Sequence, residues 1–152
     1  MREIEALYVV EFGDVVGPGY RNGGIVILET ARIFGGDSGY YYIGDYSVFG
    51  DRFEASVCIT KHNPAGANAF GDDAPEFEIR VLGNIESDSI VATMERMDWP
   101  GLRLPLRLTR KVGLPCGVCV TMKGRSLVRS QSGVRCRIFI GSGIAALRWP
   151  RA

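Results

Sequence analysis

The clearest pattern in the chain lies at residues 52–60, which read RFEASVCIT. Every second position is apolar, namely Phe53, Ala55, Val57 and Ile59. Successive side chains of a β-strand point to opposite faces, so this period of two predicts a strand with one buried face. The preceding residues 49–51, Phe-Gly-Asp, are typical of a turn and predict a hairpin.

Similar segments lie on both sides of this strand, separated by residues that favour turns. We expect strands at residues 3–12, 25–28, 32–34, 40–48, 76–81, 89–95 and 102–109. Turn signals occupy residues 13–24 and 84–88, and residues 63–74 are predicted as a long surface loop. Residues 1–110 contain no convincing amphipathic helix.

The number and spacing of these strands indicate the fold class. Strands joined by short links pair antiparallel as a meander, and a meander can close into an up-and-down barrel that has no exposed edge. We therefore expect an all-β, antiparallel barrel of about eight strands, with a two-sheet sandwich as the open alternative. Such a barrel has room for side chains or one small ligand. Pro105 cannot donate to a ladder and is expected at a seam, an edge or a bulge.

The alternation also predicts which side chains are buried. We expect burial of Phe53, Val57, Ile59, Phe77, Ile79, Val81, Leu104, Leu106 and Leu108. We expect exposure of Glu54, Glu76, Glu78, Arg103 and Arg107.

Charge is distributed unevenly along the 152 residues. All 17 acidic residues lie in residues 1–110, which carry a net charge of −7, whereas residues 111–152 carry eight basic residues and no acid. Such asymmetry indicates two differently built segments. We predict a small barrel domain at 1–110 and a basic, cysteine-containing C-terminal extension at 111–152 that is either poorly ordered or packed only in part. A read-through end of the gene is an open alternative for the extension.

The chain lacks the features of membrane and secreted proteins. No run of 18 apolar residues occurs, so we expect no membrane span. The N-terminus lacks the pattern of a secretory signal, and four cysteines without such a signal argue against a disulfide scaffold. We therefore predict a cytoplasmic protein.

No constellation for catalysis or metal binding is evident. Any Ser-His-Asp or Cys-His arrangement must use His62, the only histidine, and no nucleophile motif surrounds it. Cys116 and Cys119 have zinc-ligand spacing, but Cys136 is the only further candidate where four ligands are needed. We predict a protein that is not an enzyme and has no cofactor or metal. The basic residues of the extension are spread out, which argues against nucleic-acid binding, and a nucleic-acid binder that acts through the extension is the weakest of three alternatives.

A resemblance to a known family begins at residues 35–46, which read GGDSGYYYIGDY. Together with residues 6–12 (ALYVVEF), 23–26 (GGIV) and 106–110 (LRLTR), this stretch resembles the GrlR family of bacterial proteins, which regulate type III secretion negatively. The resemblance covers about residues 4–110. It implies a small lipocalin-like β-barrel and a non-enzymatic regulator that binds a protein partner, such as a transcriptional activator, and forms a homodimer.

The best-known branch of that family carries four acidic residues at the turn after the Tyr-x-Gly strand. The corresponding stretch here is residues 48–51, where Asp51 is the only acid. Inward tyrosines could line a cavity for a small apolar ligand, and outward ones could form a dimer or partner surface. Asp37 is also expected to cap backbone N–H groups in a turn that uses positive φ at Gly35 and Gly36. The candidate partner or ligand surface comprises Asp37, Tyr40, Tyr41, Tyr42, Tyr46 and Asp51.

Overall fold

The computed structural model describes residues 3–16, 19–115, 121–122, 125–129 and 135–138. The chain divides into two compact units, Met1–Gly113 and Leu114–Ala152. The first unit holds the strands expected from the sequence, and each unit is described below by itself.

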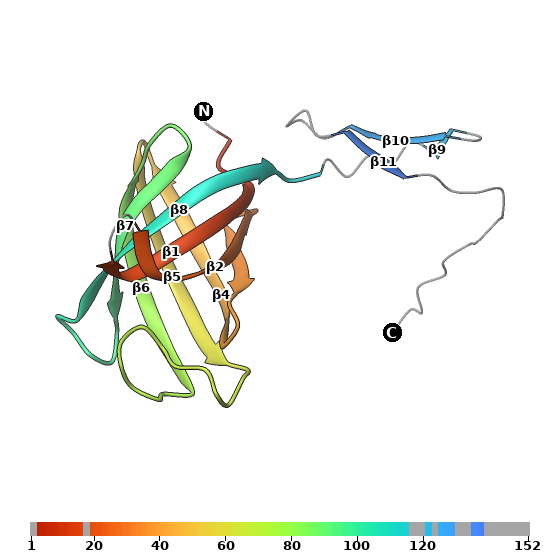
Figure 1. Cartoon of the computed structure of the whole chain (residues 1–152). Helices are drawn as coiled ribbons and strands as arrows, with labels where there is room; N and C mark the ends of the chain where they lie inside the picture. Colours follow the sequence, from red (N-terminus) through yellow and green to blue (C-terminus); the bar gives the residue numbers. More distant parts are fainter. Residues whose placement is uncertain (1–2, 17–18, 116–120, 123–124, 130–134, 139–152) are drawn as a thin grey trace. The chain divides into compact units, whose positions relative to one another are not determined.

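The first unit is a closed antiparallel β-barrel of eight strands, in which each strand pairs with the next along the chain. The strands are β1 (Ala6–Val16), β2 (Gly19–Glu29), β3 (Arg32–Gly36), β4 (Tyr40–Phe49), β5 (Arg52–Lys61), β6 (Glu76–Ile85), β7 (Ser89–Arg96) and β8 (Arg103–Gly113). The predicted all-β barrel of eight strands is therefore confirmed (Figure 1).

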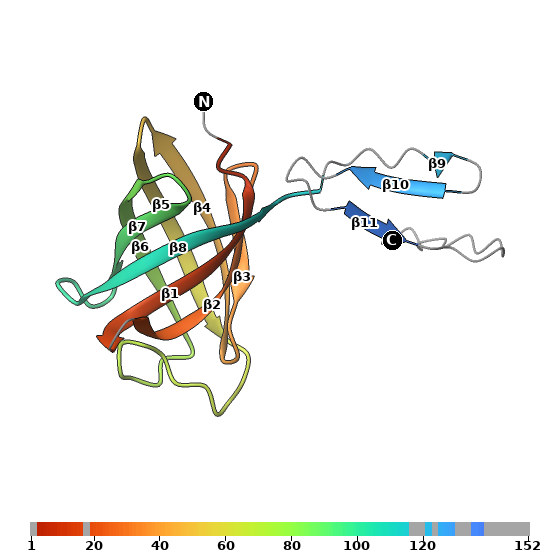
Figure 2. The ribbon, with the colours of Figure 1, turned by 45° about the horizontal axis from the view of Figure 1, so that its top comes forward.

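The pairing of β1 with β8 closes the barrel and distinguishes it from a sandwich. The two strands lie side by side in both views (Figures 1 and 2), with Val10 opposite Leu108 and Phe12 opposite Leu106. Pro105 lies beyond the last described partner on β1 and faces Thr93 on β7 alone. This position agrees with the predicted edge, because the missing N–H of proline removes no hydrogen bond between β1 and β8.

The hairpin of β1 and β2 is longer than the turn signals at residues 13–24 predict. Glycine residues within it pair with β1 as part of the ladder, so that Gly24 faces Val10 and Gly23 faces Glu11. A register shift follows Phe12, where Gly13 has a φ of 92°. A positive φ is readily adopted by glycine, and an extra residue in one strand increases its bend. Gly13 thus lies at the irregularity in β1, whereas Gly23 and Gly24 pair in the regular ladder despite the local preference of glycine for turns.

The C-terminal end of the barrel also differs from the prediction. Strand β8 continues to Gly113, beyond the predicted domain boundary at residue 110, and Val112 pairs with Leu7 on β1. The barrel unit therefore includes the first residues of the predicted extension.

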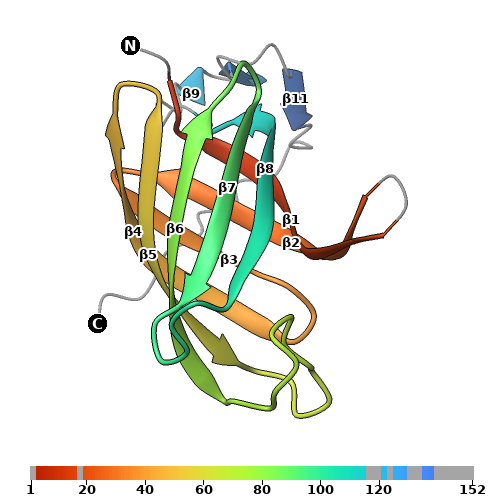
Figure 3. The same cartoon turned by 90° about the vertical axis from the view of Figure 1, so that its left-hand side faces the viewer.

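The core of the barrel consists of the side chains that point inward from the strands. Of the nine side chains predicted to be buried, eight are buried and Leu104 is half-buried. The predicted outward residues are exposed except Glu54, which is half-buried between Arg52 and Arg80. Figure 3 shows the barrel from the side, with the strands crossing obliquely around this interior.

The described residues of the second unit form three short strands, where the sequence predicts no sustained pattern. They are β9 (Thr121–Met122), β10 (Arg125–Arg129) and β11 (Arg135–Ile138), which form a sheet in the order β11-β10-β9. Cys116 and Cys119, the pair with zinc-ligand spacing, lie outside the described residues. Within the part of the chain that the structure describes, no helix is long and apolar enough to cross a membrane.

Candidate functional site

A cavity of about 330 Å³ lies inside the barrel. Its wall consists mainly of apolar side chains that follow the inward parity of the strands, including Val26, Ile33, Val57, Ile59, Phe77 and Leu106. Ligand pockets usually measure roughly 300–1,000 Å³ and combine an apolar wall with a few polar groups. The interior is thus large enough for one small molecule.

Several polar groups of the cavity come from neighbouring turns at one end of the barrel, and others, including Arg21, Asn22 and Tyr42, come from strands β2 and β4. Asp37 and Ser38 belong to the turn between β3 and β4, and Asn68 belongs to the β5–β6 loop, which we define as residues 62–75. The backbone N–H groups of His62 and Asn63 donate to the carbonyl oxygen of Gly39, at 2.9 and 3.2 Å. These bonds join the loop to the β3–β4 turn at the mouth of the cavity.

Asp37 organises the β3–β4 turn with its carboxylate. Its Oδ1 accepts hydrogen bonds from the backbone N–H groups of Gly39 (2.7 Å) and Tyr40 (2.8 Å), which confirms the predicted cap. Its Oδ2 accepts the hydroxyl proton of Tyr42. The side chain therefore both shapes the turn and holds a tyrosine of the cavity wall.

The predicted role of the two glycines before Asp37 is wrong. Neither Gly35 nor Gly36 has a positive φ. A Cβ on Gly35 would lie 2.2 Å from the backbone oxygen of Ile25, and one on Gly36 would lie 2.8 Å from that of Tyr40. These glycines are needed because the backbones of neighbouring strands approach each other closely.

The structure separates the six predicted surface residues. Tyr40, Tyr42 and Tyr46 are buried, whereas Tyr41 points outward and is 45% exposed. Only Asp37, Tyr40 and Tyr42 line the cavity. Asp51 lies in the turn between β4 and β5, which the antiparallel order places at the other end of the barrel from Asp37. The six residues therefore do not form one surface.

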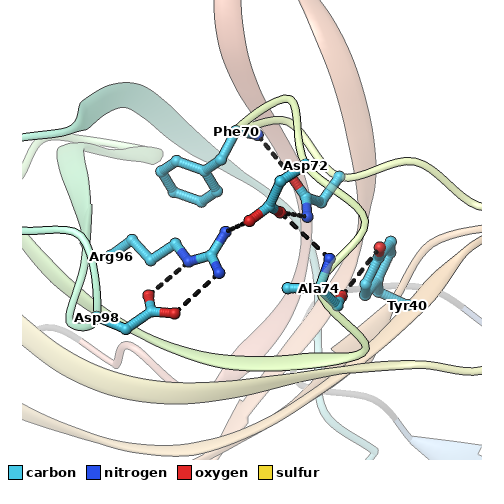
Figure 4. Close-up of polar contacts among 7 residues, drawn as sticks. Tyr40, Phe70, Asp72, Ala74, Arg96 and Asp98 are labelled. Carbon is cyan, nitrogen blue, oxygen red and sulfur yellow. Dashed lines mark hydrogen bonds and ion pairs between the residues drawn. The ribbon is translucent and has the colours of Figure 1, made fainter.

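A buried arginine near the loop is absent from the sequence prediction. Arg96 continues the inward parity of Ile90, Ala92 and Met94 on β7 and is only 4% exposed. Its Nη1 donates to Asp72 at 2.7 Å, while Nε and Nη2 donate to Asp98 at 2.5 and 2.9 Å (Figure 4). The period of two could have located this residue, because the alternation extends to the end of β7.

Arg96 also packs on the aromatic rings beneath the loop. Its guanidinium carbon lies 4.5 Å from the ring centre of Phe77 and 6.0 Å from that of Phe70. Both distances are within the range of a cation–π interaction. The rings of Phe70 and Phe77 meet edge to face at 5.7 Å. The guanidinium thus joins the loop residue Phe70 to the wall of the cavity.

Asp72 connects Arg96 to other residues of the β5–β6 loop through hydrogen bonds. Its side chain accepts hydrogen bonds from the Asn68 amide and from the backbone N–H of Ala74 (3.3 Å). The Oδ1 of Asn68 in turn accepts from the backbone N–H of Phe70 at 2.9 Å (Figure 4). The β5–β6 loop is therefore held at the cavity mouth by a connected set of hydrogen bonds that ends on a buried charge.

These contacts change the acidity of the groups involved. The hydrogen bond from Arg96 lowers the pKa of Asp98. The hydrogen bond from Asn68, followed by that from Arg96, lowers the pKa of Asp72. Burial, followed by the hydrogen bond to Asp37, raises the pKa of Tyr42. At neutral pH both aspartates are ionised and the Tyr42 hydroxyl keeps its proton.

Asp72→Asn is expected to loosen the β5–β6 loop. The substitution removes the charge that pairs with Arg96, so the loop should open more often and the amide of Phe70 should exchange its hydrogen about tenfold faster. Amide hydrogen exchange followed by NMR measures this rate. Asp73→Asn is the matched control, because Asp73 pairs with Lys61 and is 86% exposed. Equal exchange rates in the two variants would contradict the assigned role of Asp72.

The loop should also respond to acid. A carboxylate whose pKa is lowered by folding stabilises the native state above its ordinary pKa, and this contribution is lost as the pH falls through the lowered value. For Asp72 and Asp98 the loss should begin below about pH 4. After correction for the intrinsic rate, exchange at Phe70 in the unsubstituted protein should then approach that of Asp72→Asn. If the corrected exchange rates of Phe70 in the unsubstituted protein and in Asp72→Asn differ by the same factor at every pH, the ionised Asp72 does not stabilise the loop.

Within the described residues, no group of three or more His, Cys, Asp or Glu side chains is placed to hold a metal ion. Neither a protein-family model nor a curated protein matches the sequence.

Proposed function

We propose that the barrel binds one small, mainly apolar molecule in its interior. The observation that carries this proposal is the cavity of about 330 Å³ with its apolar wall and few polar groups. Transfer of apolar surface from water into such a cavity is favourable by roughly 25 cal/mol per Å². The β5–β6 loop at the mouth then covers the ligand, with Phe70 contributing to the wall.

A cavity-filling substitution tests this function. Ala55 lines the cavity and is buried, so Ala55→Leu should occupy part of the space. The neutral fluorescent probe N-phenyl-1-naphthylamine should bind to the unsubstituted protein, and Ala55→Leu should weaken its binding by about tenfold, or ~1.4 kcal/mol.

The control for this experiment is Ser56→Leu, which adds a comparable apolar side chain at the next residue. Ser56 is exposed on the outer side of the same strand, so the affinity for the probe should not change. Absence of probe binding to the unsubstituted protein, or equal weakening by both substitutions, would contradict a binding site inside the barrel.

A second candidate function is protein-binding regulation in the cytoplasm, as the resemblance to the GrlR family implies. The supporting observation is an outer surface that we call the β2–β4 apolar face, formed by Ile25, Phe34, Tyr41 and Ile43. These side chains are between 37% and 48% exposed. Phe34 lies opposite Ile43 in the ladder, which makes the face continuous across β3 and β4. Exposed apolar patches commonly mark contact sites between proteins.

We expect this face to form a homodimer, because a symmetric pair buries the same patch on both copies. Sedimentation at micromolar concentration should then give about twice the monomer mass of 16.6 kDa. Ile43→Glu should give the monomer mass, whereas Val91→Glu on β7 is the control and should remain dimeric. A monomer mass for the unsubstituted protein would rule out the dimer.

The regulatory partner requires a separate experiment. Immobilised protein should retain the same bacterial protein from repeated lysates, and Ile43→Glu should not retain it if the β2–β4 apolar face makes the contact. Repeated failure to retain any protein would count against the regulatory function and would leave the ligand-binding proposal unaffected.

A further inference from the structure

The polar part of the cavity wall contains a tyrosine and a carboxylate that act as one unit. Tyr42 is 7% exposed and projects from β4 into the interior, and Asp37 lies beside it in the β3–β4 turn. The hydroxyl group of Tyr42 donates its proton to Oδ2 of Asp37. Any polar group of a ligand that reaches this part of the wall must pair with what these two side chains leave available.

The hydrogen bonds that Asp37 and Tyr42 already make determine which further bonds they can make with a ligand. Oδ1 of Asp37 already accepts two backbone N–H bonds, from Gly39 and Tyr40, and Oδ2 accepts the Tyr42 proton. A tyrosine hydroxyl has a single proton and further acceptor capacity on its oxygen. With the proton committed to Asp37, Tyr42 can only accept a hydrogen bond from a ligand. Burial and the neighbouring carboxylate raise the pKa of Tyr42, so the proton stays in place at neutral pH.

The charges at the mouth of the cavity also favour a ligand that donates a hydrogen bond over one that carries a negative charge. A carboxylate of a ligand at this position would meet the negative charge of Asp37 and the acceptor oxygen of Tyr42, and neither of these two side chains offers it a proton. Arg21 also lines the cavity, but it is exposed, so water and salt screen its attraction for an anion. The Asn68 amide donates one of its two protons to Asp72, and Asn22 and Ser38 also line the cavity with groups that can donate, but all three side chains are neutral. Neutral donors do not cancel the charge of Asp37, so a carboxylate beside Tyr42 is desolvated next to a second negative charge.

We propose that the cavity selects an apolar molecule that carries a hydrogen-bond donor, a hydroxyl or an amino group, over the corresponding carboxylate, with the donor bound to Tyr42 Oη. This inference rests on the proposed ligand-binding function and adds the chemical class of the ligand. It assigns the selectivity to Asp37, which commits the Tyr42 proton and supplies the negative charge.

Competition against N-phenyl-1-naphthylamine tests this selectivity at pH 7. Decanol, decylamine and decanoate are straight chains of ten carbon atoms in total, and they differ in the polar group at the end. Decanol and decylamine should displace the probe about tenfold more effectively than decanoate. Decyl methyl ether, which accepts but cannot donate a hydrogen bond, should be weaker than decanol.

Asp37→Asn is the decisive variant. The asparagine oxygen can still cap the turn, but its amide group donates to Tyr42 and frees the tyrosine proton for a ligand. The preference for decanol over decanoate should therefore disappear. Asp45→Asn, which removes an exposed carboxylate from the outer side of β4, is the control for the change in net charge and should keep the preference.

The possible results separate this inference from the proposed function. Probe binding with decanoate at least as effective as decanol would overturn the inference and leave the ligand-binding function intact. An unchanged preference in folded Asp37→Asn would also overturn it. If Asp37→Asn does not fold, displacement of the probe from the unsubstituted protein by decanol and by decyl methyl ether tests the inference instead. Equal displacement by the two compounds would overturn it. Absence of probe binding would overturn the proposed function and the inference together.

Discussion

Replacing Phe77 by alanine is expected to lower the free energy of unfolding by about 3–5 kcal/mol. Phe77 is 7% exposed on β6, and its ring meets Tyr40 edge to face at 6.1 Å. The same ring supports the guanidinium of Arg96 at 4.5 Å and the edge of Phe70 at 5.7 Å. The substitution therefore removes apolar contacts, enlarges the cavity and takes away the ring beneath a buried charge.

The midpoint and slope of urea unfolding measure this loss. Phe49→Ala is the matched control, because Phe49 carries the same side chain at the end of β4 but is 64% exposed. Its removal should change stability by no more than about 0.5 kcal/mol. Equal effects of the two substitutions would mean that the inward and outward faces of the sheet are assigned wrongly.

Gly44→Ala is expected to destabilise the barrel by about 1–3 kcal/mol or more. Gly44 lies on the inward parity of β4, where a Cβ would meet the backbone oxygen of Ser56 at 2.1 Å and the Cα of Val57 at 2.8 Å. Relief of this overlap requires the backbones of β4 and β5 to separate, because no flexible side chain is available to move. The methyl group would thus disturb the hydrogen-bonded ladder between β4 and β5.

Gly19→Ala distinguishes this steric effect from the general effect of replacing glycine. No atom lies within 4 Å of a Cβ at Gly19. Alanine restricts the unfolded chain, which stabilises a protein by about 0.4–1 kcal/mol where the native backbone accepts it. Urea unfolding should therefore show a large loss for Gly44→Ala and little change or a small gain for Gly19→Ala. A similar result for both would contradict the close approach of β4 and β5.

The candidate site was only partly predictable. Asp37 could be recognised as a capping residue because an Asp after glycines has a local tendency to bond the backbone ahead of it. Its bond to Tyr42 and its place in the cavity wall depend on the fold of the β3–β4 hairpin. The role of Asp72 depends on Arg96, which is distant in sequence, so the loop pattern by itself predicted only a surface loop.

The turn between β2 and β3 shows how tertiary contacts can override a local preference. Thr30 and Ala31 have positive φ values of 50° and 60°, which residues with a Cβ adopt at a cost in energy. The backbone N–H of Thr30 donates to Glu5 at 2.7 Å, and the carbonyl oxygen of Ala31 accepts from Tyr46 at 2.9 Å. Glu5 precedes β1 and Tyr46 lies on β4, so contacts with distant parts of the chain stabilise a turn that contains no Gly or Asn.

The sequence by itself determined that residues 1–110 form the strands of a barrel and, where apolar and polar residues alternate, which face of a strand is buried. Alternation is a local property, because neighbouring side chains of a strand point to opposite sides whatever the strand pairs with. Residues 52–60 and 76–81 therefore predicted Phe53, Val57, Phe77 and Ile79 as core, and all four are buried.

Only the tertiary structure decided that the sheet closes, that a cavity remains inside and that Arg96 is buried beneath the loop. Closure depends on the pairing of β1 with β8, which are separated by most of the barrel sequence. The cavity is the space that side chains from all eight strands leave unfilled. Both features arise from contacts between residues far apart in the chain, and a pattern of period two carries no information about which distant strands meet.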